Sequence, residues 1–406
     1  MIALNLAQLK AYRAKYQDEL FDGCLPFWME HSIDQTHGGI YNSLDRTGHV
    51  FSRDKSVWLQ GRATWMFAHL CNQYGQRDAW QKLSESCLLF LKQYGADPVD
   101  GRLFFMLTED GRPLRKRRYY FSEAFYIMAC AEYASAFDAP DTLEIARQYY
   151  ELIVSIYRDP TCDPYKITPK FYGQNRPMRA FAPSMILLNV SHVMARCDAE
   201  RAERYEKDAL EFTQDFIRYF YKPDLNALLE TVGPNGEFMT DVSSGRTMNP
   251  GHAVEGAWFL IVQALKTGDR ELLCKAEQIF RWSVERGWDK EHNGLFSFID
   301  VLGHPPEQLE HNMKLWWPQC ELLICALMLY EQTDDPYYLD WFIKADAYVF
   351  DYFKDPLYGE WYGYLTHDNV PAVGSVKGNL FKGPFHLPRM LVNIEKCLER
   401  LEAKAQ

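Results

Sequence analysis

The fold is decided by the segment AWQKLSESCLLFLKQYGADPVDGRLFFMLTEDG (Ala79–Gly111) together with the stretch YYFSEAFYIMACAEYA (Tyr119–Ala134) that follows it. Residues 79–94 carry apolar side chains at three- and four-residue spacing with polar ones between them, which predicts an amphipathic helix. The Asp/Gly turn that follows leads into a short apolar alternation, which predicts a small β-hairpin. Residues 119–134 are apolar on nearly all sides, which is typical of a helix surrounded by protein.

This unit of amphipathic helix, hairpin and apolar helix recurs along the chain. Asp-led turns, each with a glycine and an aromatic or aliphatic run behind it, begin 62 to 66 residues apart, at Asp34, Asp97, Asp159, Asp224, Asp289 and Asp355. The copies at Asp159 and Asp224 are weaker than the others. Self-similarity at a fixed period is the signature of a repeat architecture. Six periods account for the whole chain, so we expect one domain spanning residues 1–406.

The apolar helices of the six units indicate how the units assemble. They include VWLQGRATWMFAHL, FAPSMILLNVSHVM, GHAVEGAWFLIVQAL, PQCELLICALMLY and FHLPRMLVNIEKCL. Because amphipathic helices need one wet face and apolar helices need to be surrounded, the pattern predicts an all-α fold. This is an (α/α)6 barrel of six helical hairpins, with the apolar helices inside and short β-hairpins in the connecting loops. An open solenoid is the alternative, but it needs polar caps on its end repeats, and the last apolar helix resembles the central ones.

Composition limits the function. The 406 residues carry a net charge of −11, which argues against a nucleic-acid partner. An aromatic content of 15% suits a carbohydrate site as well as a large core. The ten cysteines are scattered without a CxxC pair, so we expect reduced thiols and a cytoplasmic protein. The first twenty residues read as a charged amphipathic helix, and no apolar run approaches the roughly 18 residues of a membrane span, so no membrane partner is expected.

Polar residues stand near the starts of the apolar helices. Prolines occupy or precede the first turn of four of them, at Pro183, Pro250, Pro318 and Pro384. The polar set comprises Arg62, Glu123, His252, Glu255, Glu321 and His386. If all inner helices run in the same direction, these groups converge at one end of the barrel, which predicts a small-molecule site. For His252 and Glu255 taken alone, a buried polar pair within the core is the alternative.

Several chemistries compete for this set. No HExxH or Cys/His cluster adds metal ligands to His252 and Glu255, so no metal is predicted. The phosphate-binding patterns GxxxxGK[ST] and GxGxxG are absent. Glu123, Glu255 and Glu321 could supply the two acids of an inverting glycosidase. Two histidines on different helices are better suited to removing a proton from a carbon and returning one to its opposite face, since imidazole titrates near neutrality.

Six stretches, in order from Phe27 onward, carry a family resemblance: FWMEHSIDQTHGGIYNSLDRTG, SVWLQGRATWMF, MNPGHAVEGAWFL, MKLWWPQCE, DPLYGEWYGYL and KGPFHLPRML. Together they resemble the N-acylglucosamine 2-epimerases. The resemblance implies an (α/α)6 barrel, usually a homodimer, that interconverts N-acetyl-D-glucosamine and N-acetyl-D-mannosamine. It also implies that no metal is needed and that ATP or another nucleotide acts as an activator that is not consumed.

The resemblance also implies residue roles. The essential arginine of the family falls on Arg62 in WLQGR, its two histidines on His252 in NPGH and His386 in FHLPR, and its glutamate on Glu321 in WWPQCE. We expect substrate contacts from Glu255, Glu123, Trp58, Tyr41, Trp316 and Trp317, with core packing as the alternative for the aromatic residues. No motif marks the nucleotide site. The basic loop KITPKFYGQNRPMR (Lys166–Arg179) is its candidate, and a solvated surface loop is the alternative.

The expected reaction follows from the acidity of a proton α to a carbonyl. The sugar opens to its aldehyde, one of His252 and His386 removes the C2 proton, and the other returns a proton to the opposite face. Arg62 stabilises charge that develops on oxygen, while Glu255 and Glu321 hold imidazole tautomers or bind hydroxyls. The alternatives are a barrel relative that epimerises cellobiose or isomerises mannose, a glycoside hydrolase, and a non-catalytic partner that binds another protein.

Overall fold

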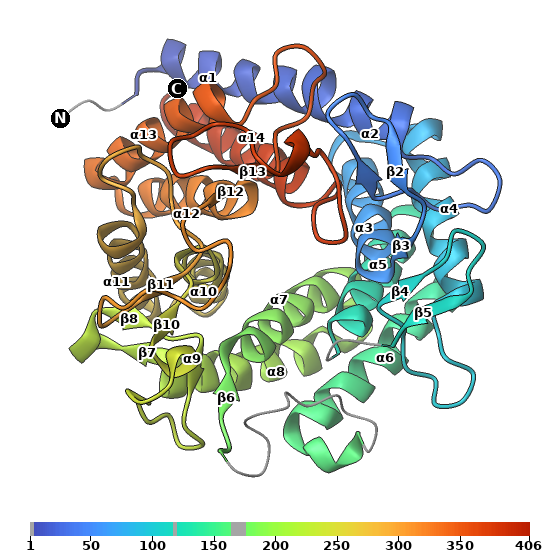
Figure 1. Ribbon diagram of the computed structural model, residues 1–406, viewed down its shortest axis with the longest axis horizontal. Helices are drawn as coiled ribbons and strands as arrows, with labels where there is room; N and C mark the ends of the chain where they lie inside the picture. Colours follow the sequence, from blue (N-terminus) through green and yellow to red (C-terminus); the bar gives the residue numbers. More distant parts are fainter. Residues whose placement is uncertain (1–3, 117–119, 164–175) are drawn as a thin grey trace.

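The computed structural model describes residues 4–116, 120–163 and 176–406, and these form a double ring of helices around one axis (Figure 1). The inner ring consists of α3 (Val57–Tyr74), α5 (Phe121–Phe137), α7 (Phe181–Cys197), α10 (Pro250–Thr267), α12 (Trp316–Thr333) and α14 (His386–Lys404). The outer ring consists of α1 (Leu6–Asp18), α4 (Asp78–Tyr94), α6 (Pro140–Arg158), α8 (Ala202–Asp215), α11 (Arg270–Gly287) and α13 (Pro336–Tyr352). The predicted (α/α)6 barrel is confirmed.

The two rings differ in burial as their sequences predict. In the inner helix α5 every residue from Ser122 to Ala134 is buried. The outer helix α4 buries only one face, which includes Trp80, Leu83 and Leu91 at helical spacing. No helix within the described part of the chain is both long enough and apolar enough to cross a bilayer.

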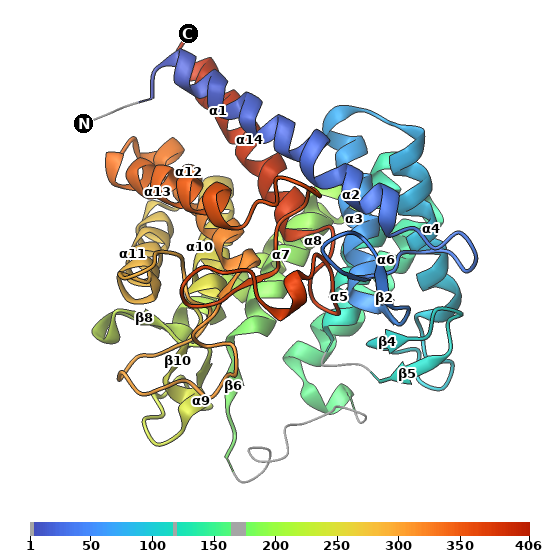
Figure 2. The ribbon, with the colours of Figure 1, turned by 45° about the horizontal axis from the view of Figure 1, so that its top comes forward.

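The ring is closed by the two ends of the chain. Helix α1 packs along the outside of α14 (Figure 2), so the first outer helix partners the last inner helix. The Arg13 guanidinium on α1 pairs with three carboxylates of α14, those of Glu395 (2.7 Å), Glu399 (2.7 Å) and Glu402 (3.3 Å). The barrel is therefore a closed ring and the open solenoid is wrong.

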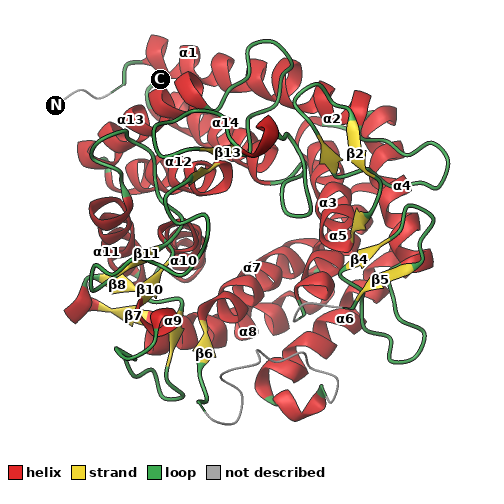
Figure 3. Cartoon of the chain, in the orientation of Figure 1, coloured by secondary structure: helices red, strands yellow, loops and turns green. Residues whose placement is uncertain are grey.

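Short strands occupy the loops between helices (Figure 3). All pairs are antiparallel. In the first half of the chain β1 (Ser43–Leu44) pairs with β2 (Val50–Ser52), and β4 (Met106–Leu107) pairs with both β3 (Lys55–Ser56) and β5 (Pro113–Arg115). Further along, the pairs are β6 (Arg179–Ala180) with β9 (Thr231–Val232), β7 (Tyr221–Lys222) with β8 (Ala227–Leu228), β10 (Thr247–Met248) with β11 (Ile299–Asp300), and β12 (Lys314–Leu315) with β13 (Tyr364–Leu365). Among these described pairs, only β1–β2, β4–β5 and β7–β8 are local hairpins. Strands β3, β6, β10 and β12 lead directly into inner helices and pair with a strand of the following repeat.

Shorter helical segments complete the chain. They are α2 (Leu25–His31), α9 (Ser243–Arg246), the π-helical η1 (Glu19–Cys24) and η4 (Phe216–Phe220), and the 3₁₀ segments η2 (Pro160–Cys162), η3 (Ala199–Arg201), η5 (Pro223–Leu225) and η6 (Val373–Ser375).

Four of the six repeats share one ion-paired turn. The leading aspartate accepts a hydrogen bond from the backbone N–H two residues later, and a lysine close before the next inner helix pairs with its carboxylate. The pairs are Lys55–Asp34 (2.7 Å), Lys116–Asp97, Lys314–Asp289 (2.5 Å) and Lys377–Asp355 (3.1 Å). Each pair fastens a turn to the start of an inner helix, because the lysine belongs to the segment that enters that helix.

The two weaker repeats are built differently. Asp224 lies within η5, in the turn that joins β7 to β8, and Asn226 in the same turn takes a left-handed conformation (φ 47°). Asp159 accepts from the Thr161 N–H, but the residues after Asp163 lie outside the described chain. Neither aspartate forms an ion pair with a lysine among the described residues, so the weaker sequence match reflects a different turn.

Candidate active site

Three inner helices bring the predicted polar residues to one place at their N-terminal ends. His252 and Glu255 lie in the first two turns of α10, Glu321 lies in α12, and His386 begins α14. The start of α10 is fixed by Pro250 at its first position and by Asn249, whose side chain accepts the His252 N–H at 3.0 Å. Helix-start chemistry therefore sets where the His252 imidazole can point.

The His386 imidazole is buried among charged groups. Its Nδ1 lies 2.7 Å from Oε1 of Glu321 and 3.3 Å from Nη2 of Arg389. Because the nearer partner is a carboxylate, which only accepts, the contact favours the tautomer with the hydrogen on Nδ1 and not on Nε2. Burial, together with the positive charges of Arg389 and Arg62, holds the pKa of His386 well below its usual value. His386 is therefore neutral at physiological pH.

Arg389 joins the carboxylates of two inner helices. Its Nη2 donates to Oε1 of Glu255 at 2.7 Å and to Oε1 of Glu321 at 2.6 Å. The second oxygen of Glu321 accepts from Nε1 of Trp258 at 2.8 Å. Glu255, Glu321 and His386 have the ligand types and spacing of a metal site, but the guanidinium is the cation that these two carboxylates hold.

His252 has a different partner. Its Nδ1 lies 3.1 Å from each carboxylate oxygen of Glu230, a residue of the β8–β9 loop. The backbone of Glu230 donates to Thr247 and accepts from Phe181, so the loop is held from both sides. Burial lowers the pKa of His252, but the charge and hydrogen bond of Glu230, with the more distant carboxylates, outweigh it and leave this pKa raised. His252 therefore keeps its proton to a higher pH than an ordinary histidine.

Trp317 lies against both imidazoles. Its ring centroid is 5.0 Å from that of His252 and 5.8 Å from that of His386. The neighbouring Trp316 contacts His386 edge-on at 6.2 Å, and its buried Nε1 has no hydrogen-bond partner among the described residues. One tryptophan ring therefore connects the two histidines, and a second offers an unused N–H donor beside them.

Arg62 completes the group from α3. Its guanidinium lies over the rings of Phe125 (4.1 Å) and Phe385 (4.9 Å), and Nη1 donates to the Phe381 carbonyl at 3.2 Å. Its buried Nε has no partner within the described chain. Burial is the main cause that lowers the pKa of Arg62 to about 9, so it stays charged at neutral pH.

Trp58 and Tyr41 contact residues other than the two histidines in the described part of the chain. Trp58 packs beside Arg62 at 5.9 Å and donates from Nε1 to Ser122. Tyr41, in the turn of the first repeat, donates to Glu109 of the β4–β5 loop at 3.2 Å, and burial and nearby carboxylates raise the pKa of Tyr41 to about 12.

Glu123 is buried and accepts from Nε of Arg102 (2.7 Å) and from the Leu103 N–H (3.0 Å). Gln60 and Gln319 hold the same kind of backbone group in their own repeats, at Ile40 and Leu295. Glu123 thus fastens a turn to α5, and the structure does not bring it together with the histidines.

Three residues of the site were not predicted: Arg389, Glu230 and Trp258. Arg389 stands three residues after His386, on the same face of α14, so helical spacing could have identified it. Trp258 stands three residues after Glu255 in the same way. Glu230 belongs to the weak fourth repeat, and only loop closure in three dimensions brings it to His252. The candidate nucleotide loop Lys166–Arg179 lies outside the described residues except for its last four positions.

Comparison with known proteins identifies relatives over nearly the whole chain. Residues 38–381 match the family model described as N-acylglucosamine 2-epimerase. N-acylglucosamine 2-epimerase of Bos taurus is 36% identical over 97% of this chain and 92% of its own length. Cellobiose 2-epimerase of Dictyoglomus turgidum is 22% identical over 96% of this chain and 99% of its own length.

The fold is also that of a solved structure. The cellobiose 2-epimerase from Spirochaeta thermophila DSM 6192 superposes with a TM-score of 0.84 at 21% identity, covering 97% of this chain and 98% of that one. The family match spans most of the chain, and the two histidines, Arg62 and Glu321 are gathered at one end of the barrel. The chain belongs to the N-acylglucosamine 2-epimerase family.

Proposed function

We propose that the protein interconverts N-acetyl-D-glucosamine and N-acetyl-D-mannosamine by exchanging the proton at C2 of the open-chain sugar. The observation that carries this proposal is a pair of imidazoles, His252 and His386, that contact one tryptophan ring and are each held at Nδ1 by a carboxylate. Fixing Nδ1–H leaves each Nε2 to exchange a proton with substrate. Epimerisation needs two such groups on opposite faces of the reacting carbon.

The opposite pKa shifts give the two histidines different roles, one as proton acceptor and one as proton donor. His386, held neutral, is suited to accept the C2 proton, while His252, whose pKa is raised, is suited to donate one. The C2–H electron pair moves into an enolate as the proton goes to Nε2 of His386. A proton from His252 then forms the new C2–H bond on the other face. In the reverse direction the two residues exchange roles.

Arg62 is the group best placed for the enolate oxygen. The open-chain aldehyde gains negative charge at O1 when C2 is deprotonated, and a fixed cation nearby lowers that cost. The Arg62 guanidinium is supported by aromatic rings, and its buried Nε has no hydrogen-bond partner among the residues that the structure describes. The same is true of the Trp316 N–H, which is a second donor for a sugar oxygen.

The site fits the alternatives less well. A glycosidase needs one free acid and one free carboxylate, whereas Glu255 and Glu321 share one guanidinium and Glu321 also holds His386. Greater identity to the N-acylglucosamine 2-epimerase than to the cellobiose 2-epimerase supports an N-acylated amino sugar as substrate. Rates measured side by side on N-acetylmannosamine, cellobiose and mannose test this, and a preference for either of the other two sugars would contradict it.

Solvent deuterium tests the chemistry. In D₂O, proton NMR of the early reaction should detect deuterium at C2 of the product while the remaining substrate is still unlabelled, whichever sugar is supplied. This asymmetry is expected because the acid that reprotonates C2 carries a solvent proton and differs from the base. Product with no solvent label would overturn proton exchange by two residues, and label appearing equally early in the substrate would indicate a single base.

The family resemblance supports three further proposals: activation by ATP or another nucleotide that is not consumed, a homodimer, and a cytoplasmic location. For the last, all ten cysteines are free and most are buried, as expected of a reducing compartment. Rates with and without ATP, with ADP formation followed in parallel, test the first. Light scattering at micromolar concentration tests the second, and a monomeric mass would refute it.

A further inference from the structure

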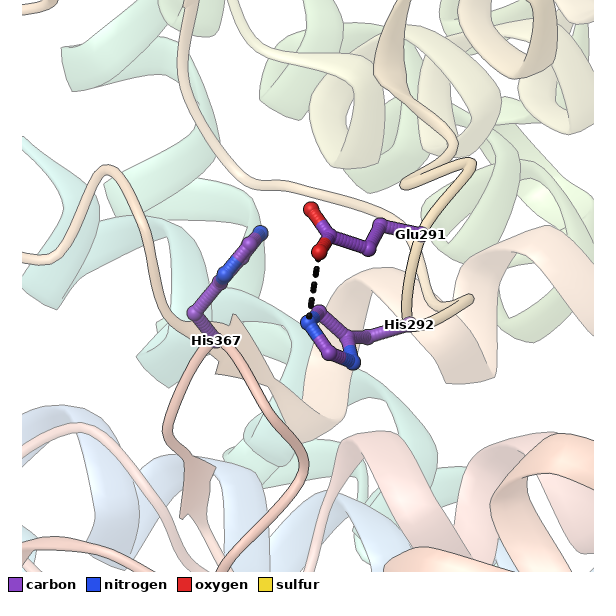
Figure 4. Close-up of side chains that lie close together, drawn as sticks. All are labelled: Glu291, His292 and His367. Atoms are coloured by element: carbon purple, nitrogen blue, oxygen red, sulfur yellow. Dashed lines mark ion pairs between the residues drawn. The ribbon is translucent and has the colours of Figure 1, made fainter.

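A second cluster of chemically active side chains lies on the loops, apart from the residues assigned to catalysis. We name it the rim cluster: Glu291 and His292 from the turn after α11, and His367 from the loop after β13 (Figure 4). One ligand atom from each residue lies within 4.8 Å of the others. The two imidazole rings meet nearly at right angles with centroids 4.8 Å apart, and Nε2 of His292 is 3.6 Å from Oε1 of Glu291.

The rim cluster stands on a rigid support. Asn369 donates to the His292 carbonyl at 2.6 Å and accepts from the Tyr348 hydroxyl at 2.8 Å, which ties the two turns together. Lys314, in turn, donates to the His367 carbonyl and pairs with Asp289. The ring of His367 also stacks on Phe296 at 5.8 Å. The backbones of both histidines are therefore held by neighbouring side chains. The ring of His367 is also held by Phe296 and by the Asp289 carboxylate, which lies 3.2 Å from its Nε2.

We infer that the rim cluster binds one divalent transition-metal ion of the zinc class, with the two imidazoles and the Glu291 carboxylate as ligands. Two nitrogens and one oxygen are a ligand set for such an ion, at bond lengths of about 2.0–2.2 Å. Three protein ligands leave a coordination position for water or another ligand. His367 also lines an open cleft of about 470 Å³, together with Arg286, Phe298, His304 and His311, so the ion would adjoin that cleft.

The first repeat supplies an internal comparison. Asp34 and His37 lie in the corresponding turn, Glu109 lies in the loop after β4, and the three are equally close to one another. That cluster has only one imidazole, and its carboxylates already pair with cations, Asp34 with Lys55 and Glu109 with Arg53. In the rim cluster Glu291 forms no ion pair with a lysine or arginine among the described residues, so its carboxylate is available to an added ion.

Calorimetric titration tests the site, with untagged protein first stripped by a chelator so that no histidine tag competes. Zn²⁺ should bind with one equivalent per chain, and Co²⁺ in its place should give the visible absorption of a protein-bound ion. His292→Ala and His367→Ala should each weaken binding by more than the roughly 10- to 100-fold that loss of an outer-shell partner costs. His37→Ala, the matched change in the first repeat, should leave affinity unaltered.

Two results would overturn the inference: no stoichiometric binding by the unaltered protein, or unchanged affinity in His292→Ala or His367→Ala. Circular dichroism of each variant checks that the helices are retained. Because the loops and not the helices carry these residues, we expect the spectrum to stay the same. A further variant, Glu291→Gln, keeps shape and removes only charge, and it should weaken Zn²⁺ binding with both histidines still present.

Discussion

His252 and His386 occupy similar positions in two inner helices yet experience opposite electrostatic environments. His252 faces Glu230, whose charge and hydrogen bond raise its pKa. His386 faces a carboxylate as well, but burial and the cations Arg389 and Arg62 lower its pKa. The difference teaches that a carboxylate next to a histidine does not by itself set the proton affinity of the imidazole. The other charges within reach decide whether that carboxylate raises the pKa or only orients the ring.

Removing either imidazole should have the largest effect. We expect His252→Asn and His386→Asn each to lower kcat by on the order of 10²–10⁴-fold, because each removes one of the two proton-transferring groups. Coupled assay or NMR rates measure this, and thermal melts should stay close to the unaltered protein. The exposed His49→Asn is the matched control and should retain full activity. A fully active His386→Asn variant would refute the division of roles.

Changing the cation beside His386 should come next in size. Arg389 is 3% exposed and holds Glu255 and Glu321, so Arg389→Met leaves two buried carboxylates without their partner. Breaking a buried pair in this way costs about 3–5 kcal/mol of the free energy of unfolding. Guanidinium titration measures the loss. Glu255→Gln combined with Arg389→Met should recover part of it, and a double variant as unstable as the sum of both changes would contradict the coupling.

Replacing each of the two carboxylates that hold the imidazoles should change the pH–rate profile in a different way. Glu230→Gln removes the main group that raises the pKa of His252, so the alkaline limb of the pH–rate profile should move to lower pH. Glu321→Gln should lower kcat across the whole pH range instead, because it disturbs the tautomer of His386. Initial rates between pH 5 and 10 distinguish them. Identical pH–rate profiles for the two variants would mean that Glu230 and Glu321 have the same effect on catalysis, which would contradict this prediction.

The smallest expected effect is on stability against pH, where the histidines act with opposite sign. An unfolded histidine titrates near 6.5. Below that pH the unfolded chain takes up a proton that folded His386 does not, so acidification costs stability. Folded His252 keeps its proton to higher pH, so it stabilises at low pH and loses that contribution as pH rises through its raised pKa.

Relative to the unaltered protein, His386→Asn should therefore gain stability between pH 8 and pH 5, whereas His252→Asn should lose it. Each change amounts to at most about 1.4 kcal/mol per pH unit. Denaturant titrations at the two pH values measure both variants. Parallel changes in the two variants would contradict the opposite shifts.

Most of the barrel could be predicted from the sequence because its signal is local and repeated. Alternation of amphipathic and apolar helices identified the two rings, and the Asp-led turns located their junctions. The pairing of β10 with β11 or β12 with β13 could not be predicted, since strands of two residues have no periodicity and their partners belong to the next repeat. Likewise the closure of the ring by α1 depends on the far end of the chain.

The site was predictable where residues lie at helix starts and less so where loops meet. His252, Glu255, Glu321 and His386 are positioned by the helices that carry them. Glu123 was expected among them because it starts an inner helix, yet its position in the repeat is that of Gln60 and Gln319, which fasten turns. Aligning the six repeats on one another would have separated this framework role from the site.

The ion pairs between Arg13 of α1 and the carboxylates of α14 affect how the protein folds to its active form. Arg13 and Glu395 are separated by 382 positions, so their contact is among the most distant in sequence that the chain can make. Contacts of such separation form slowly, and α14 also carries His386 and Arg389. Catalytic competence should therefore appear late in refolding, after most helix has formed, with the two termini meeting in the same step that completes the proton-transfer pair.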